Sequence, residues 1–119
     1  MHLHHVAVIV GDLDRSSQFY EGVLGLSRDP RPGLGFPGLF YSLGSGQQLH
    51  LMQIDDPYKD CEQPSHGGRD YHFALATDDL ESLMVRLDRQ SIIYTRSRSG
   101  RAAIFFRDPD GNAIEVIEC

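Results

Sequence analysis

The feature that most constrains this chain is an internal repeat that covers most of its 119 residues. Residues 5–13 align without a gap on residues 72–80, with His, Ala, Asp and Leu at matching places. Residues 40–52 align on residues 105–117 at nearly the same offset. Because a repeat of this kind decides the architecture of a chain, we predict one supersecondary module used twice.

Each copy is predicted to run strand, helix, strand, strand, strand. In the first copy, strands are expected at residues 4–10, 26–28, 39–43 and 48–54, with a helix at 13–24. In the second copy, strands are expected at residues 71–76, 92–96, 102–107 and 113–118, with a helix at 80–90. Asp12 is predicted to cap the first helix, and Asp78 or Asp79 the second.

The predicted fold class is therefore α+β, built from two βαβββ modules in a single domain of residues 1–119. The first module spans about 3–54 and the second about 71–119. Residues 55–70 are rich in Asp, Pro, Gly and Gln without a period, so they are expected to be the linker.

Composition excludes several classes of function. A net charge of −6 argues against nucleic acid as a partner, because neutralising phosphates needs a basic surface. No apolar run approaches the roughly 20 residues of a membrane span, and no secretory signal is visible. The two cysteines, Cys61 and Cys119, have no metal or redox spacing. We expect a cytoplasmic protein without membrane contact.

Four positions related by the repeat carry side chains that bind metals. His5 aligns with His72 on the first strand of each module, and His50 aligns with Glu115 on the last strand. Each lies in an apolar strand, where an unpaired polar group is costly. Imidazoles with a carboxylate suit Fe(II), Mn(II), Co(II), Ni(II) or Zn(II), so the four residues are predicted to be metal ligands. His50 has an alternative role, as a residue that lines the pocket or acts as a general base.

Two motifs resemble a known family over nearly the whole chain. They are H-V-A-V-x-V-x-D-L-x-x-S-x-x-F-Y-x-x-V-L-G-L near the start and F-x-x-D-P-D-G-N-x-I-E near the end. Both are similar to the glyoxalase/bleomycin-resistance/extradiol-dioxygenase group, the vicinal oxygen chelate superfamily. The resemblance implies two βαβββ modules that curl into an open barrel-like cup around a divalent metal, and a homodimer. It also implies ligands on the first and last strands of each module, which here are His5, His50, His72 and Glu115.

The resemblance leaves the reaction open. The first hypothesis is a glyoxalase-type lyase or isomerase, in which the metal chelates two neighbouring oxygens of a small substrate and Glu115 or His50 acts as the base. A second is an Fe(II) extradiol dioxygenase that uses His5, His72 and Glu115. A third is a metal-free protein that sequesters a drug-like ligand between two subunits. Fosfomycin-resistance members share the trio but have a hydroxyl residue where Ala7 stands, so the chain departs from them.

The last hairpin supplies candidate substrate contacts. Basic side chains surround it in an acidic protein and would hold an anionic substrate through paired hydrogen bonds; the alternative is a solvated hairpin tip. The residues assigned to this role are Arg96, Arg98, Arg107 and Tyr94, with Arg101 in the same cluster. Strand parity is expected to turn His4 away from His5, and His66 is expected to be solvated in a glycine-rich loop.

Overall fold

The structure is a computed structural model that describes all 119 residues, and it divides into two compact units, Met1–Asp60 and Cys61–Cys119. Each unit has the element order β-α-β-β-β, which confirms the predicted α+β class of two βαβββ modules. Neither helix is long and apolar enough to cross a membrane.

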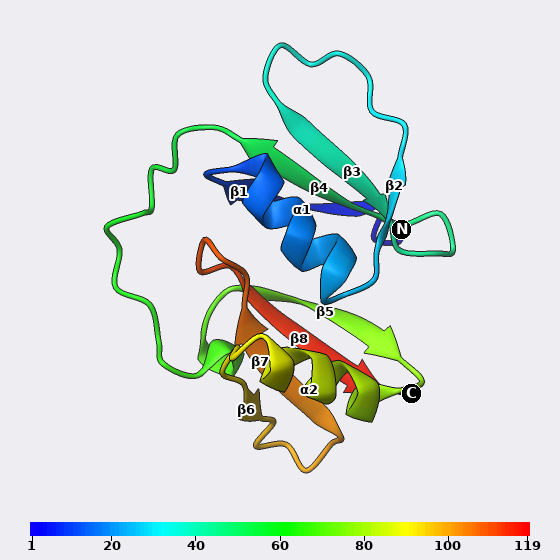
Figure 1. Ribbon diagram of the computed structural model, residues 1–119, viewed down its shortest axis with the longest axis vertical. Coiled ribbons are helices and arrows are strands. Elements are labelled where there is room, and N and C mark those ends of the chain that lie inside the picture. The colour runs from blue at the N-terminus through cyan, green and yellow to red at the C-terminus, as the bar shows by residue number, and fades with distance from the viewer. The chain divides into compact units, whose positions relative to one another are not determined.

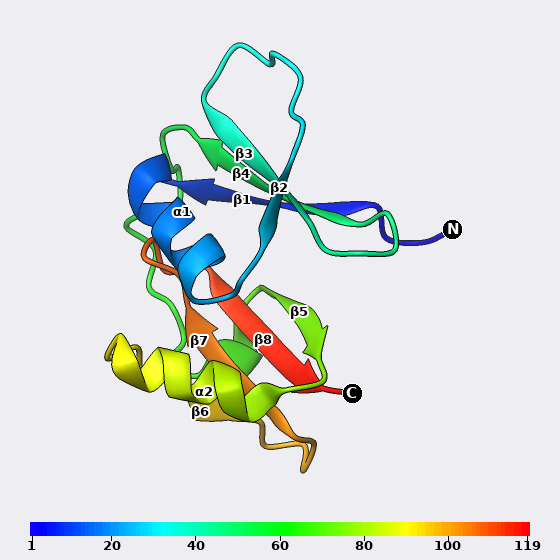
Figure 2. The same ribbon diagram turned by 45° about the vertical axis from the view of Figure 1, so that its right-hand side comes forward.

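The first unit holds one four-stranded sheet and one helix. Its elements are β1 (His5–Val10), α1 (Leu13–Gly22), β2 (Ser27–Asp29), β3 (Gly38–Ser42) and β4 (Gln48–Gln53). The strand order is β1-β4-β3-β2, in which β1 is parallel to β4 and the other pairs are antiparallel. Figure 2, where this sheet is seen nearly edge-on, places α1 on one side of it.

The second unit repeats this plan. Its elements are η1 (Gly67–Arg69), β5 (His72–Thr77), α2 (Leu80–Arg89), β6 (Thr95–Arg96), β7 (Ala103–Arg107) and β8 (Ala113–Glu118). The strand order, β5-β8-β7-β6, matches that of the first sheet, with β5 parallel to β8 (Figure 1).

Alternating burial along the strands separates a helix-side face from an opposite face in the first module. On β4, Leu49 and Leu51 are fully buried, while His50 between them is half-buried on the other face. Tyr41 of β3 shares the leucine face and lies beside Tyr20 of α1, with ring centroids 6.0 Å apart. The helix therefore covers the leucine face, and His50 lies on the face that the helix leaves open.

Helix capping follows the sequence prediction at both helices. The Asp12 carboxylate accepts hydrogen bonds from the backbone of Asp14 and Arg15 at the start of α1. Asp79, rather than Asp78, caps α2 by accepting from the Ser82 backbone. These bonds satisfy amides at the first turn, which have no partner within the helix.

Three details differ from the sequence prediction. The first helix ends at Gly22 rather than at residue 24. The strand expected at 92–96 is reduced to β6, because the backbone of Ile92 bonds to Leu87 at the end of α2 and ties residue 92 to the helix. The linker contains the short helix η1, which aperiodic sequence does not reveal.

Candidate functional site

The four predicted ligand positions occupy equivalent places in the two sheets. In the parallel pair β1–β4, Ala7 lies opposite His50, two residues beyond His5. In the pair β5–β8, Ala74 lies opposite Glu115, two residues beyond His72, so the register is the same. Each histidine of a first strand is thus a diagonal neighbour of the ligand-type residue on the last strand, on one face of the sheet.

In the first module, the two imidazoles stack. The rings of His5 and His50 have centroids 4.1 Å apart and planes within 16°. Phe40, directly across from His50 on β3, stacks on its other side with centroids 3.5 Å apart. The His50 ring is therefore held between two rings on the open face of the sheet.

Polar neighbours complete the surroundings of His50. Its Nε2 lies 2.9 Å from the Gln48 side-chain oxygen, and Gln48 Nε2 donates to Asp29 Oδ2 at 2.9 Å. Burial and the adjacent His5 imidazole lower the pKa of His50 below its ordinary value, with a smaller effect from Arg31. The neutral imidazole is favoured as a result, and it is the form that binds metals or accepts a proton.

His4 lies next to His5, contrary to the expectation from strand parity. Their Nδ1 atoms are 2.8 Å apart. The parity argument was wrong because β1 begins at His5, so the alternation of a strand does not extend to residue 4.

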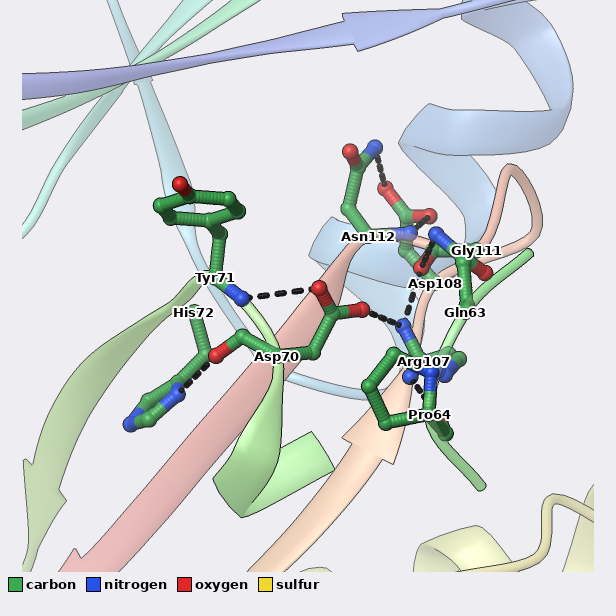
Figure 3. Close-up of polar contacts among 9 residues, drawn as sticks. All are labelled: Gln63, Pro64, Asp70, Tyr71, His72, Arg107, Asp108, Gly111 and Asn112. Carbon is green, nitrogen blue, oxygen red and sulfur yellow. Dashed lines mark hydrogen bonds and ion pairs between the residues drawn. The ribbon is translucent and has the colours of Figure 1, made fainter. Parts of the chain in front are cut away.

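In the second module, an imidazole faces a carboxylate. His72 Nε2 lies 3.5 Å from Glu115 Oε2, and the Glu115 side chain is only 7% exposed. The opposite ring nitrogen of His72, Nδ1, is 2.8 Å from the backbone oxygen of Asp70 (Figure 3). The ring edge of Phe105 packs against His72 with centroids 5.2 Å apart.

Arg101 is the arginine of the hairpin cluster that reaches this pair. Its Nη2 lies 3.4 Å from Glu115 Oε1, while 59% of its side chain remains exposed. From the sequence, Arg101 was expected in the cluster but had no predicted role. Arg101 precedes β7, and β7 pairs with β8, the strand that carries Glu115.

The other predicted substrate contacts differ in their surroundings. Arg96 and Arg98 are exposed, and Tyr94 is half-buried. Arg107 is engaged within the module: Nη1 donates to Asp70 Oδ2 and to the Gly111 backbone oxygen, each at 2.8 Å, and Nη2 donates to the Pro64 backbone oxygen (Figure 3). These bonds tie the segment before β5 to the last hairpin.

His66 is buried, so the expectation of a solvated loop residue was wrong. It is 8% exposed, its Nδ1 lies 2.7 Å from the Thr95 hydroxyl, and its ring packs edge-on against Phe105 at 5.0 Å. The cause is η1, which begins directly after His66 and lies on Phe105 and Ala113 of the sheet.

Sequence reasoning also missed Arg31, which lies over the sheet of the first module. Its guanidinium carbon is 4.9 Å from the Phe36 ring centroid and 5.8 Å from that of Phe40, and its Nη2 donates to the Phe36 backbone oxygen. A methyl group added at Gly38 would come within 2.8 Å of this guanidinium. No sequence signal indicated this close approach, because Gly38 is the first residue of β3 and the strand was expected to begin at residue 39.

No group of three or more His, Cys, Asp or Glu residues gathers around one point in the structure. Each module instead holds a pair of donors of the type that divalent transition metals take. These residues fit a metal by their chemistry, since a neutral His72 ring and the Glu115 carboxylate, 3.5 Å apart, can both bind a cation.

Comparison with known proteins identifies the family. The Glyoxalase/Bleomycin resistance protein/Dioxygenase superfamily matches residues 2–116. Glyoxylase I 4 of Arabidopsis thaliana is 31% identical over 123 residues, which cover 98% of this chain and 70% of that protein. The mitochondrial methylmalonyl-CoA epimerase of Mus musculus is 33% identical over 107 residues, which cover 86% of this chain and 58% of the epimerase.

A solved structure shares the fold. The glyoxalase/dioxygenase from Nostoc punctiforme superposes with a TM-score of 0.75 at 24% identity, covering 98% of this chain and 90% of that one. The resemblance seen in the two sequence motifs is thereby confirmed. The chain belongs to the Glyoxalase/Bleomycin resistance protein/Dioxygenase superfamily.

Proposed function

We propose that this chain is a divalent-metal-dependent enzyme of the glyoxalase type, a lyase or isomerase whose small substrate binds through two neighbouring oxygens. Membership of the superfamily and similarity to a protein named Glyoxylase I and to an epimerase support this reading. The observation that carries it is the His72–Glu115 pair, two acceptors facing each other at 3.5 Å, with His5 and His50 in the same register in the other module.

The proposed ligands are His5, His50, His72 and Glu115. Each module supplies two of these side chains, and we propose that the protein forms a homodimer. Fe, Mn, Ni, Co and Zn all accept imidazole nitrogen with carboxylate oxygen.

A bound divalent metal would act as a Lewis acid that stabilises negative charge on a substrate oxygen. We propose Glu115 as the base that would accept a proton from the carbon next to that oxygen. His50 is a second candidate base, because its lowered pKa keeps it neutral near pH 7. The exposed guanidinium of Arg101 holds Glu115 Oε1 and so limits the rotation of this carboxylate.

The proposed substrate is a small anionic molecule. Arg96 and Arg98 are exposed on the hairpin next to Arg101 and can attract it, with Tyr94 beside them. We assign Arg107 a positioning role instead, because its nitrogens already bond to Asp70 and to two backbone oxygens. We propose that the protein acts in the cytoplasm.

Elemental analysis tests this proposal. Protein purified without chelator should carry a stoichiometric divalent metal, and the double variant His5→Ala/Glu115→Ala should lose it. The matched control, His2→Ala/Glu62→Ala, removes the same residue types from exposed positions and should keep the metal. Metal retained by the first variant would remove the ligand assignment.

Two further outcomes separate the rival functions. Iron-dependent oxygen uptake with catechols would favour the dioxygenase that uses His5, His72 and Glu115. Equal thermal stability and equal ligand binding in chelator-treated and metal-loaded samples would favour a metal-free sequestering protein.

A further inference from the structure

In His50 and in His72, one nitrogen of the imidazole ring lies within hydrogen-bond distance of a residue outside the proposed ligand set. The nitrogen that makes this contact differs between the two histidines. In His50 it is Nε2, next to the Gln48 side chain. In His72 it is Nδ1, next to the Asp70 backbone oxygen. A neutral imidazole carries its proton on one nitrogen and a lone pair on the other, so each outer partner decides which nitrogen can bind a cation.

The chemistry of Asp29 fixes the orientation of the Gln48 amide. An ionised carboxylate only accepts hydrogen bonds, so the Gln48 atom 2.9 Å from Asp29 Oδ2 must be the NH₂ group. The amide oxygen then faces His50 Nε2, also at 2.9 Å. An amide oxygen only accepts, so His50 Nε2 must carry the proton.

His72 is held by a backbone carbonyl instead of a side chain. Its Nδ1 lies 2.8 Å from a backbone carbonyl, which only accepts, so Nδ1 carries the proton. The carbonyl belongs to Asp70, whose carboxylate is held by Arg107 Nη1 at 2.8 Å and accepts from the Tyr71 backbone at 2.8 Å (Figure 3). The lone pair of His72 is therefore on Nε2, the nitrogen that faces Glu115.

We propose that two hydrogen-bonded residue pairs hold His50 and His72 in opposite tautomers. The pairs are Asp29–Gln48 in the first module and Arg107–Asp70 in the second. His50 then offers Nδ1 as its donor and His72 offers Nε2. Asp29, Gln48, Asp70 and Arg107 are positioning residues in this scheme.

The difference has a geometric consequence. Nδ1 is bonded to Cγ, close to the main chain, whereas Nε2 lies at the far edge of the ring. His50 would therefore hold a cation nearer to its strand than His72 does. The tautomers are properties of the metal-free protein, and only the ligand role rests on the proposed function.

Nitrogen-15 spectroscopy of the metal-free protein tests the assignment. Long-range ¹H–¹⁵N correlation at about pH 8.5, roughly two units above the ordinary imidazole pKa, distinguishes protonated from unprotonated ring nitrogens. The His50→Gln and His72→Gln variants assign the signals. We expect the proton on Nε2 of His50 and on Nδ1 of His72. The same tautomer in both residues, or a proton on Nδ1 of His50, would overturn the proposal.

The Asp29→Asn variant tests whether Asp29 fixes the orientation of the Gln48 amide. An asparagine amide can donate as well as accept, so Gln48 is free to turn its NH₂ group toward His50. We expect a mixture of both His50 tautomers, with His72 unchanged as the internal control. An unchanged His50 pattern would remove Asp29 from the scheme. The Gln48→Met variant removes the acceptor itself and should give the same mixture if Asp29→Asn does not fold.

Zinc titration of the same samples separates this inference from the proposed function. Binding should shift Nδ1 of His50 and Nε2 of His72. Opposite tautomers without any zinc-induced shift would sustain the hydrogen-bond assignment and count against the metal-dependent function.

Discussion

The two modules have the same strand order and register, yet they support their ligand-type residues by different means. In the first module, side chains bond to one another across the sheet, from Asp29 to Gln48 to His50. In the second, the place of Gln48 is taken by Ala113, and η1 covers it: a methyl group added at Gly67 would lie 3.4 Å from the Ala113 side chain. The first module supports its face with hydrogen bonds between side chains, and the second with a packed segment of chain and the Asp70 backbone oxygen.

A second difference lies on the neighbouring strands. Gly38 of β3 pairs with Met52, and the equivalent position on β7 is Ala103, which pairs with Ile117. The first module needs glycine at this point because an added Cβ would lie 2.4 Å from the Leu51 backbone oxygen and 2.8 Å from the Arg31 guanidinium. The two modules thus share their strand order and register but differ in their side chains. Equivalent positions therefore carry an imidazole in the first sheet and a carboxylate in the second.

If the modules are equivalent at their cores, matched substitutions should cost the same. Leu49 of β4 and Ile114 of β8 occupy equivalent positions and are fully buried. Leu49→Ala and Ile114→Ala should each lower the free energy of unfolding by about 2–5 kcal/mol, through lost transfer energy and a cavity. Denaturant titration measures this. A loss below about 1 kcal/mol for one variant alone would show that only the other module has a well-packed core.

The Gly38→Ala variant tests the second difference. The new methyl group would lie 2.4 Å from the Leu51 backbone oxygen and 2.8 Å from the Arg31 guanidinium, and a strand carbonyl cannot move aside cheaply. We expect a loss of about 1–3 kcal/mol, as for other overpacked sites. Gly33→Ala is the matched control, because a methyl group there meets nothing within 4 Å. Equal stability of the two variants would mean that the Leu51 backbone and the Arg31 side chain can both shift to make room for the methyl group.

The repeat explains why so much of the fold was predictable. Strand alternation and the aspartate that caps each helix, Asp12 or Asp79, are local signals. Because of the repeat, both kinds of signal occur in each module. The same alignment paired His5 with His72 and His50 with Glu115, and the strand registers bear out that equivalence. Whether these four residues bind a metal stays a prediction.

What escaped prediction arises from contacts between segments that are distant in the sequence and that the repeat does not contain. η1 has no periodicity, and its position depends on packing against Phe105 and on the bond from His66 to Thr95. Arg31 lies in a loop rich in proline and glycine, where no sequence pattern indicates what a side chain covers. Each of these features occurs in only one module, Arg31 in the first and η1 in the second. Comparison of the two sequence copies therefore could not reveal them.

The contact between the Thr95 hydroxyl and His66, the residue directly before η1, can be removed by one substitution. Thr95→Val keeps the side-chain shape but leaves the buried His66 Nδ1 without its partner at 2.7 Å. We expect a loss of about 1–2 kcal/mol, the cost of an unsatisfied buried polar group. Hydrogen exchange of the amides at residues 67–70 should quicken with it. Thr95→Ser keeps the hydroxyl and should retain most of the stability. A Thr95→Val protein as stable as the parent would show that packing alone holds η1.

The smallest expected effect concerns pH and the first module. Burial and His5 lower the pKa of His50 from its ordinary value of 6.5, so in chelator-treated protein the unfolded chain takes up a proton before the folded one does. Well above pH 6.5 both states are neutral at this residue and it adds no pH dependence. As the pH falls below that value the unfolded state binds more protons, so His50 lowers the free energy of unfolding until the folded state is protonated as well. The His50→Gln variant should therefore lose less stability than the parent between pH 7 and about pH 5, as measured by parallel denaturant titrations. If the free energy of unfolding of the two proteins changes equally with pH, the folded environment does not disfavour the charged imidazole. The difference between the two modules would then rest on hydrogen bonding alone.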